Sequence, residues 1–149
     1  MPREARRTAR TAAQDAGRSP VGRTAWGLRV VLAICVVVSG VVHYARWHTG
    51  MRYIDVVGPA FLVNAVAGVV IGVLLLVWRH WVPLFLAFGF GAATLGAFVV
   101  ATSPVGLFGV HSRWQGAAEW TSAVTEAVAI VLGVVALVSE GGRRTKTRP

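Results

Sequence analysis

The chain has 149 residues, of which 55% are hydrophobic and only 14% are charged, and its formal net charge is +9. A soluble domain carries roughly a quarter charged residues, so this composition excludes an ordinary soluble domain and indicates a membrane protein. Cys35 is the single cysteine, which excludes an intrachain disulfide and any CxxC metal or redox motif.

The first predicted element is a basic tail over residues 1–24, which is rich in arginine and is expected to be disordered. A second basic tail covers residues 139–149 at the other end of the chain. The cationic side chains of both tails can contact anionic lipid head groups. We do not expect nucleic-acid binding, because no aromatic or folded module accompanies the charge.

Four long apolar segments lie between the tails, at residues 25–46, 58–78, 82–102 and 118–138. Each can cross the hydrocarbon core of a bilayer, which takes about 20 helical residues. Pro59 lies at the start of the second segment, where a missing backbone N–H is tolerated. The pattern predicts an all-α polytopic membrane protein, with residues 25–138 forming a bundle of four transmembrane helices.

The distribution of arginine and lysine predicts the orientation of these segments, because both residues prefer the cytoplasmic side. Both tails are basic, and the short turn between the second and third segments carries Arg79. The loops on the opposite side carry only Arg46, Arg52 and Arg113. We therefore predict a protein with both termini in the cytoplasm.

Small residues four positions apart predict how the helices pack, because close approach of backbones stabilises helix pairs in lipid. Such pairs occur in three of the segments: Gly68 with Gly72, Gly89 with Ala93, Ala92 with Gly96, and Ala129 with Gly133. We expect these faces to point into the bundle or to mediate oligomerisation.

Three polar residues interrupt the apolar segments, namely His43, Asn64 and Glu126. At 1.5 Å per helical residue, each is predicted to lie about 6–9 Å below the outer interface. An acidic residue near mid-bilayer costs roughly 2.5–3.5 kcal/mol, so Glu126 should face the bundle interior. The three side chains could form a proton, ligand or cofactor site that opens outward. Alternatively, they could form a structural clamp of hydrogen bonds between helices.

The two outer loops are rich in polar and aromatic residues: His48, Tyr53, Asp55, His111, Trp114 and Glu119. Tryptophan and tyrosine at this level are ordinary interfacial anchors. The histidines and acids could assemble a metal site, but no HxxxH or HxH spacing forms one in advance, so none is predicted. Haem held by two histidines is disfavoured, because His80 lies on the opposite side from His43. The cofactor, if any, is not indicated.

No catalytic motif is recognisable, since the chain lacks a nucleophile elbow, a phosphate-binding loop and a paired aspartate motif. This absence favours a role other than catalysis.

The stretches "YIDVVGPAFLVNAVAGVVIGVLLLVWRHWVP" and "VGLFGVHSRWQG" resemble a family of small four-span membrane proteins from actinobacteria that carry no assigned function. The distinctive parts are residues 53–59, 62–64 and 106–111, and a looser similarity exists to the DoxX-like four-helix proteins. The likeness covers roughly residues 25–138 and supports the four-helix architecture without supplying any catalytic residue.

We therefore expect a multi-pass protein of a bacterial cytoplasmic membrane that acts as an accessory or interaction protein, as a homo-oligomer or with a membrane protein partner. One alternative is a small proton-linked transporter or ligand-binding protein that uses Glu126, His43 and Asn64. A second alternative is a redox-associated protein that holds haem, quinone or a metal.

Overall fold

The computed structural model describes the backbone of residues 20–146 and the side chains of residues 25–139. Its long elements are four helices, α2 (Pro20–His48), α3 (Val57–Val77), α4 (Trp81–Thr102) and α5 (Ala117–Lys146). A 3₁₀ turn, η1 (Met51–Tyr53), lies between α2 and α3. Each long helix contains a stretch that can span a membrane, with a mean hydropathy of 2.1 to 2.7. The chain is a multi-pass, all-α membrane protein, as predicted.

The two outer helices of the chain extend further than predicted. α2 begins at Pro20 instead of residue 25, and α5 continues to Lys146 instead of ending at residue 138. A proline is tolerated at the first position of a helix, so Pro20 can open α2 ahead of the apolar segment. Most of the predicted first tail and its proposed lipid contacts lie outside the described residues.

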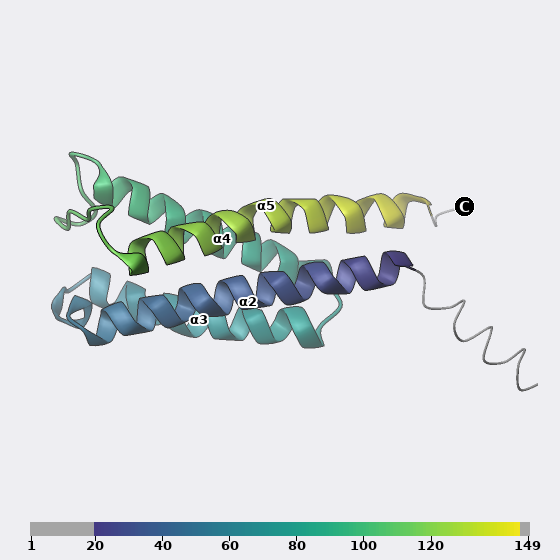
Figure 1. Cartoon of the computed structure of the whole chain (residues 1–149), viewed down its shortest axis with the longest axis horizontal. Helices are drawn as coiled ribbons and strands as arrows, with labels where there is room; N and C mark the ends of the chain where they lie inside the picture. The colour runs from purple at the N-terminus through teal and green to yellow at the C-terminus, as the bar shows by residue number, and fades with distance from the viewer. Residues whose placement is uncertain (1–19, 147–149) are drawn as a thin grey trace, which may run out of the picture.

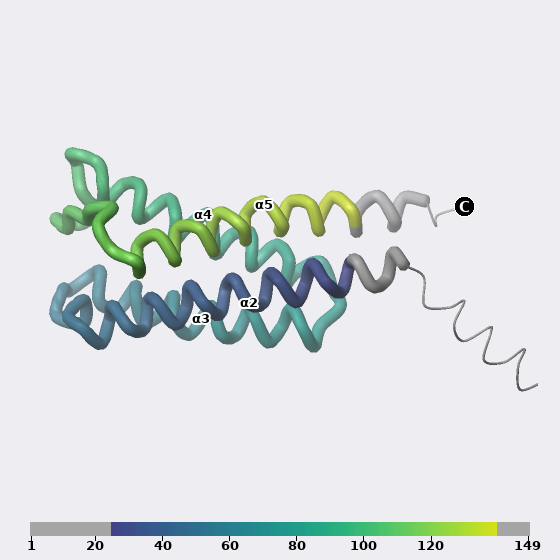
Figure 2. Tube along the Cα trace, viewed as in Figure 1, coloured from purple at the N-terminus to yellow at the C-terminus, as the bar shows by residue number. Residues whose placement is uncertain are grey.

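The helices run in alternating directions (Figure 1). The start of α2, the end of α5 and the α3–α4 turn share one end of the bundle, which we call the terminal end. The α2–α3 and α4–α5 connections share the opposite end, which we call the loop end. α2 packs along α3 and α4 packs along α5, and these two hairpins meet mainly through α2 and α5 (Figure 2).

Glycines allow α2 and α3 to approach closely. A Cβ atom added to Gly68 would lie 2.5 Å from the carbonyl oxygen of Val36, and one added to Gly40 would lie 3.0 Å from that of Ala65. A Cβ on Gly72 would lie 2.5 Å from the side chain of Val37. The predicted packing face of Gly68 and Gly72 is therefore confirmed, and its partner is α2.

Of the two roles predicted for the small residues of α4, packing inside the bundle is not observed, and oligomerisation stays a prediction. Added Cβ atoms at Gly89 and Gly96 would meet nothing within 4 Å, so these glycines do not pack inside the bundle. Gly91 packs instead, because its Cβ would lie 2.7 Å from the carbonyl oxygen of Glu126. The bulky core residues Leu84 and Phe90 set the buried side of α4 and turn the other stripe outward.

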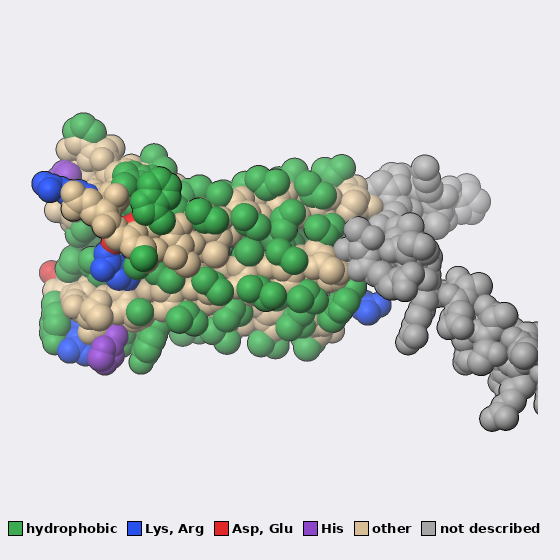
Figure 3. Space-filling view, in the orientation of Figure 1, with side chains coloured by type: hydrophobic (Ala, Val, Ile, Leu, Met, Phe, Trp, Pro, Cys, Tyr) green, Lys and Arg blue, Asp and Glu red, His purple; other side chains and the backbone are tan. Residues whose placement is uncertain are grey.

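A cluster of apolar side chains forms the core in the terminal half of the bundle, with Leu32, Val36, Leu75, Leu84, Ala87 and Ala129 at its centre. Apolar side chains also cover the visible surface of the helices, whereas charged side chains and histidines gather at the loop end (Figure 3). Arg29 is only 4% exposed and donates hydrogen bonds to the carbonyl oxygens of Trp78 and His80. These bonds tie α2 to the α3–α4 turn.

Candidate ligand site between α2 and α5

The site begins with two pairs of polar residues, each four positions apart on one helix. Ser39 and His43 lie on α2, and Ser122 and Glu126 lie on α5. Residues with this spacing share a helix face, and the packing of α2 against α5 brings the two faces together. Ser39 is 0%, His43 9% and Glu126 2% exposed. The result is a buried polar cluster in an otherwise apolar bundle.

Glu126 is held by two hydroxyl groups that both reach one of its oxygens. The Ser39 hydroxyl donates to Glu126 Oε1 at 2.8 Å, and the Ser122 hydroxyl donates to the same oxygen at 2.6 Å. The first bond joins α2 to α5, whereas the second stays within α5. Glu126 therefore does form an interhelical hydrogen bond, as the clamp interpretation requires, but only through Oε1.

The geometry of His43 fixes the position of its ring proton. Nδ1 lies 2.8 Å from the carbonyl oxygen of Ser39. A carbonyl oxygen can only accept, so Nδ1 carries the hydrogen and Nε2 of the neutral ring is an acceptor. The ring of Phe61 lies 5.1 Å from the imidazole, centroid to centroid, and covers one side of it.

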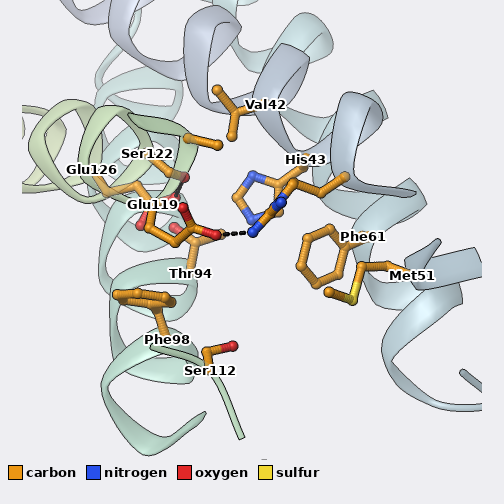
Figure 4. Close-up of a pocket in the computed structure, with 12 residues that line it drawn as sticks. Val42, His43, Met51, Phe61, Thr94, Phe98, Ser112, Glu119, Ser122 and Glu126 are labelled. Carbon is orange, nitrogen blue, oxygen red and sulfur yellow. Dashed lines mark hydrogen bonds and ion pairs between the residues drawn. The ribbon is translucent and has the colours of Figure 1, made fainter. Parts of the chain in front are cut away.

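The polar cluster borders a cavity of about 70 Å³, which we call the chamber. Figure 4 shows Glu126 and Ser122 on one side of it, Phe61 and Met51 on the other, and His43 between them. No hydrogen bond joins Glu126 Oε2 or His43 Nε2 to another described residue, and both side chains line the cavity. At ~30 Å³ for each water molecule, a cavity of this size holds about two.

An ion pair between Arg46 of α2 and Glu119 of α5 forms part of the chamber wall. Both residues also line an open cavity of about 410 Å³ at the loop end, which we call the vestibule. His111 and Arg113 lie on the vestibule wall. The side chain of Glu119 is 12% exposed and that of Arg46 is 43% exposed, so the pair stands between chamber and vestibule.

A second cavity of about 70 Å³, which we call the annex, shares five lining residues with the chamber: Met51, Phe61, Thr94, Phe98 and Ser112. Its other lining residues are all apolar: Val57, Ala97, Ala101, Leu107 and Val110. The Thr94 hydroxyl donates to the carbonyl oxygen of Phe90 in its own helix, at 2.7 Å. The chamber is thus polar toward α2 and α5 and apolar toward α3 and α4.

The charges around the chamber do not balance when Glu126 is ionised. Arg46 and Glu119 neutralise each other, and α3 and α4 contribute no ionisable side chain to the wall. Among the described residues, Glu126 forms no ion pair. With a neutral His43, the chamber therefore carries one unpaired negative charge.

The structure brings together two of the three residues predicted within the membrane. His43 and Glu126 line the same chamber, whereas Asn64 is half-buried on α3 and does not line it. Phe61 of the same helix does line the chamber, so α3 reaches the cavity with the turn before Asn64. Whether the chamber has a function stays a prediction.

The predicted outer-loop residues separate in a similar way. His111 and Glu119 line the vestibule, while the ring of Trp114 lies 4.6 Å from that of Phe98, beside the annex. His48, Tyr53 and Asp55 are exposed and line neither cavity. Within the described part of the chain, no three His, Cys, Asp or Glu side chains gather in a way that could hold a metal ion.

The sequence interpretation missed Ser39, Ser122 and Arg46. The spacing of four residues before His43 and before Glu126 was a usable signal for the two serines, because it places them on the same helix faces. No comparable signal pairs Arg46 with Glu119, which lie far apart in the chain.

No protein-family model matches this chain, and neither a curated protein nor a solved structure is significantly similar to it. The resemblance to the actinobacterial four-span proteins therefore stays a prediction, and the functional argument depends on the residues of this chain alone.

Proposed function

We propose that this protein binds a small ligand in the chamber, from the outer side of a bacterial cytoplasmic membrane. One observation carries the proposal: two buried acceptors, Glu126 Oε2 and His43 Nε2, face a cavity that adjoins an open vestibule. A structural clamp explains the hydrogen bonds to Glu126 Oε1 but assigns no role to Oε2. Ionisable residues within a membrane are expensive and usually mark a functional site.

The charge distribution supports the proposed orientation. The terminal end carries Arg79 and the two helix ends that lead into the basic tails. The loop end carries three arginines. One of those three, Arg46, is neutralised by Glu119. Because positive charge favours the cytoplasmic side, both termini belong in the cytoplasm and the vestibule opens outward.

Binding fits the packing better than transport does. The terminal half of the bundle is filled by core residues such as Leu32, Val36 and Leu84, all of which are completely buried. The chamber therefore continues toward the loop end and is closed toward the terminal end. A proton-linked transporter using Glu126 and His43 would need a second conformation that opens this core.

Access to the chamber can be tested with cysteine reporters in a Cys35→Ala background. Thr94 lines the chamber and bonds only to its own helix, so Thr94→Cys is a small change. A membrane-impermeant thiosulfonate added to spheroplasts should label Thr94→Cys. It should label Val105→Cys faster, since Val105 is 83% exposed, and should fail to label Ala87→Cys, since Ala87 is 0% exposed. If Thr94→Cys is as unreactive as Ala87→Cys, the chamber is not accessible and the proposal fails.

Ligand retention gives a second test. Native mass spectrometry of the purified protein should find a small molecule bound to the wild type and to Asn64→Ala, and should find it lost from Glu126→Gln. Asn64→Ala is the matched control, because Asn64 is a polar intramembrane residue outside the chamber. Equal retention by all three proteins would contradict a site at Glu126.

An interaction role is the second candidate, and the outward stripe of α4 favours it. Ala92, Ala93 and Gly96 are exposed, and the fold does not use them for packing. Small residues on a lipid-facing helix allow another helix to approach closely. Gly96→Leu should then lower the oligomeric state in nanodiscs, as measured by single-molecule photobleaching. An unchanged state would remove this support.

A further inference from the structure

We propose that the ligand of the chamber is a small organic ammonium ion, whose charged head lies between Glu126 and His43 and whose apolar part lies in the annex. This inference rests on the proposed function, and it adds the chemical class of the ligand. Three observations support it: the charge of the chamber, the hydrogen-bonding groups left for a ligand, and the apolar cavity next to it.

The charge of the chamber favours a cation. Ionised Glu126 has no cationic partner among the described residues, and the nearest charged groups are the mutually neutralised Arg46 and Glu119. A buried charge without a partner is unfavourable, so a bound cation would supply the missing charge. An anion at the same place would be repelled by Glu126.

The hydrogen-bonding groups point the same way. The hydroxyls of Ser39 and Ser122 donate to Glu126 Oε1, and the Thr94 hydroxyl donates to its own helix. Beside them, Glu126 Oε2 and His43 Nε2 are acceptors without a partner among the described residues, and the Ser112 hydroxyl, which also lines the cavity, can donate or accept. A ligand that matches two acceptors is a donor, as the N–H groups of an ammonium are.

The annex favours an organic cation over a metal ion. Sodium, calcium and magnesium prefer several oxygen ligands, whereas the annex contributes apolar side chains and two phenyl rings, Phe61 and Phe98. Aromatic faces stabilise alkylammonium groups through cation–π contacts. At ~30 Å³ for each water-sized group, chamber and annex together hold about four or five, which suits an amine with a short alkyl chain.

Calorimetric titration of the full chain in nanodiscs, at constant ionic strength, tests the class of ligand. The probes are butylammonium, the neutral isostere butanol, the anion butyrate, and sodium chloride. Butylammonium should bind saturably, and Glu126→Gln should weaken its binding by about ten-fold or more, because the substitution removes the charge that the ammonium pairs with. Asn64→Ala should bind butylammonium as the wild type does.

A second variant keeps the test independent of the folding of Glu126→Gln. Phe98→Leu keeps an apolar side chain but removes a phenyl face, so it should weaken butylammonium binding several-fold and leave any binding of butanol unchanged.

Equal binding of butanol or butyrate, displacement of butylammonium by sodium ions alone, or equal affinity in Glu126→Gln would each overturn the ammonium assignment. If Thr94→Cys is labelled but butylammonium does not bind, the ligand class is wrong and the accessible chamber stands. If Thr94→Cys is also unreactive, both the ligand class and the proposed function fail.

Discussion

Glu126 is held through one oxygen only, and this asymmetry is the main chemical feature of the protein. Both neighbouring hydroxyls, from Ser39 and Ser122, donate to Oε1, which leaves Oε2 at the chamber surface. The two hydroxyls fix the side chain through one oxygen, which leaves the other available to a ligand.

The serines should consequently contribute more than ordinary intramembrane hydrogen bonds. Ser39→Ala is expected to lower the free energy of unfolding by about 1.5–3 kcal/mol, the range for a bond to a charged group. The effect can be measured by steric trapping in bicelles. Thr125→Ala is the control, because Thr125 also loses a hydroxyl but bonds only to carbonyl oxygens of its own helix. A loss of only about 0.6 kcal/mol, the average for hydrogen bonds between helices within membranes, would contradict this larger contribution.

The ion pair of Arg46 and Glu119 should matter for access more than for stability. Because Arg46 is 43% exposed, solvent screens the pair, and Arg46→Gln is expected to cost at most about 1 kcal/mol. The same change should raise the labelling rate of Thr94→Cys, since it removes one side of the barrier between chamber and vestibule. The charge-reversed pair Arg46→Glu with Glu119→Arg should restore the slow rate. An unaltered rate in Arg46→Gln would show that the pair does not limit access.

Contacts between helices position the site, and the contact of α4 with α5 is an example. Gly91 lies directly beside the backbone of Glu126, so α4 supports the turn of α5 that carries the carboxylate. Gly91→Ala should destabilise the bundle by about 1–3 kcal/mol, as overpacking of a close contact does. It should also weaken ligand binding, because the added Cβ displaces Glu126.

Gly89→Ala is the matched control for this substitution. Nothing lies within 4 Å of the added Cβ, so the change should be neutral or should stabilise the helix by up to about 1 kcal/mol. Both values can be compared by unfolding in mixed micelles of dodecyl sulfate. Equal effects at Gly89 and Gly91 would contradict the packing described for α4.

Apolar length was enough to predict the helices, but it could not predict their neighbours. Residues 25–46 and 58–78 are recognisable because a bilayer demands long apolar runs. The helix stripe that faces inward depends on packing partners, which explains why Gly68 packs inside the bundle and Gly89 and Gly96 do not. Asn64 is a polar residue within a membrane span, as a site residue would be, yet Phe61 of the same helix lines the chamber and Asn64 does not. Which helices contact one another depends on how they pack in three dimensions, and hydropathy does not indicate it.

The two halves of the bundle differ in polarity. The terminal half contains the apolar core, and the loop half contains the chamber, the ion pair and the vestibule. The two hairpins meet at α2 and α5, and these same helices supply His43 and Glu126. The site therefore lies at the junction of the hairpins, where a small shift between them would change its width.

The orientation of the bundle in the membrane can be tested by labelling from one side. If both termini are cytoplasmic, the loop end lies outside, because the basic tails and Arg79 hold the terminal end at the cytoplasmic surface. In the Cys35→Ala background, Tyr53→Cys should react with an impermeant maleimide in intact spheroplasts, since Tyr53 is 75% exposed at the loop end. Arg79→Cys should react only after the membrane is permeabilised. Labelling of Arg79→Cys in intact spheroplasts would invert the orientation, and the chamber would then open to the cytoplasm and draw its ligand from there.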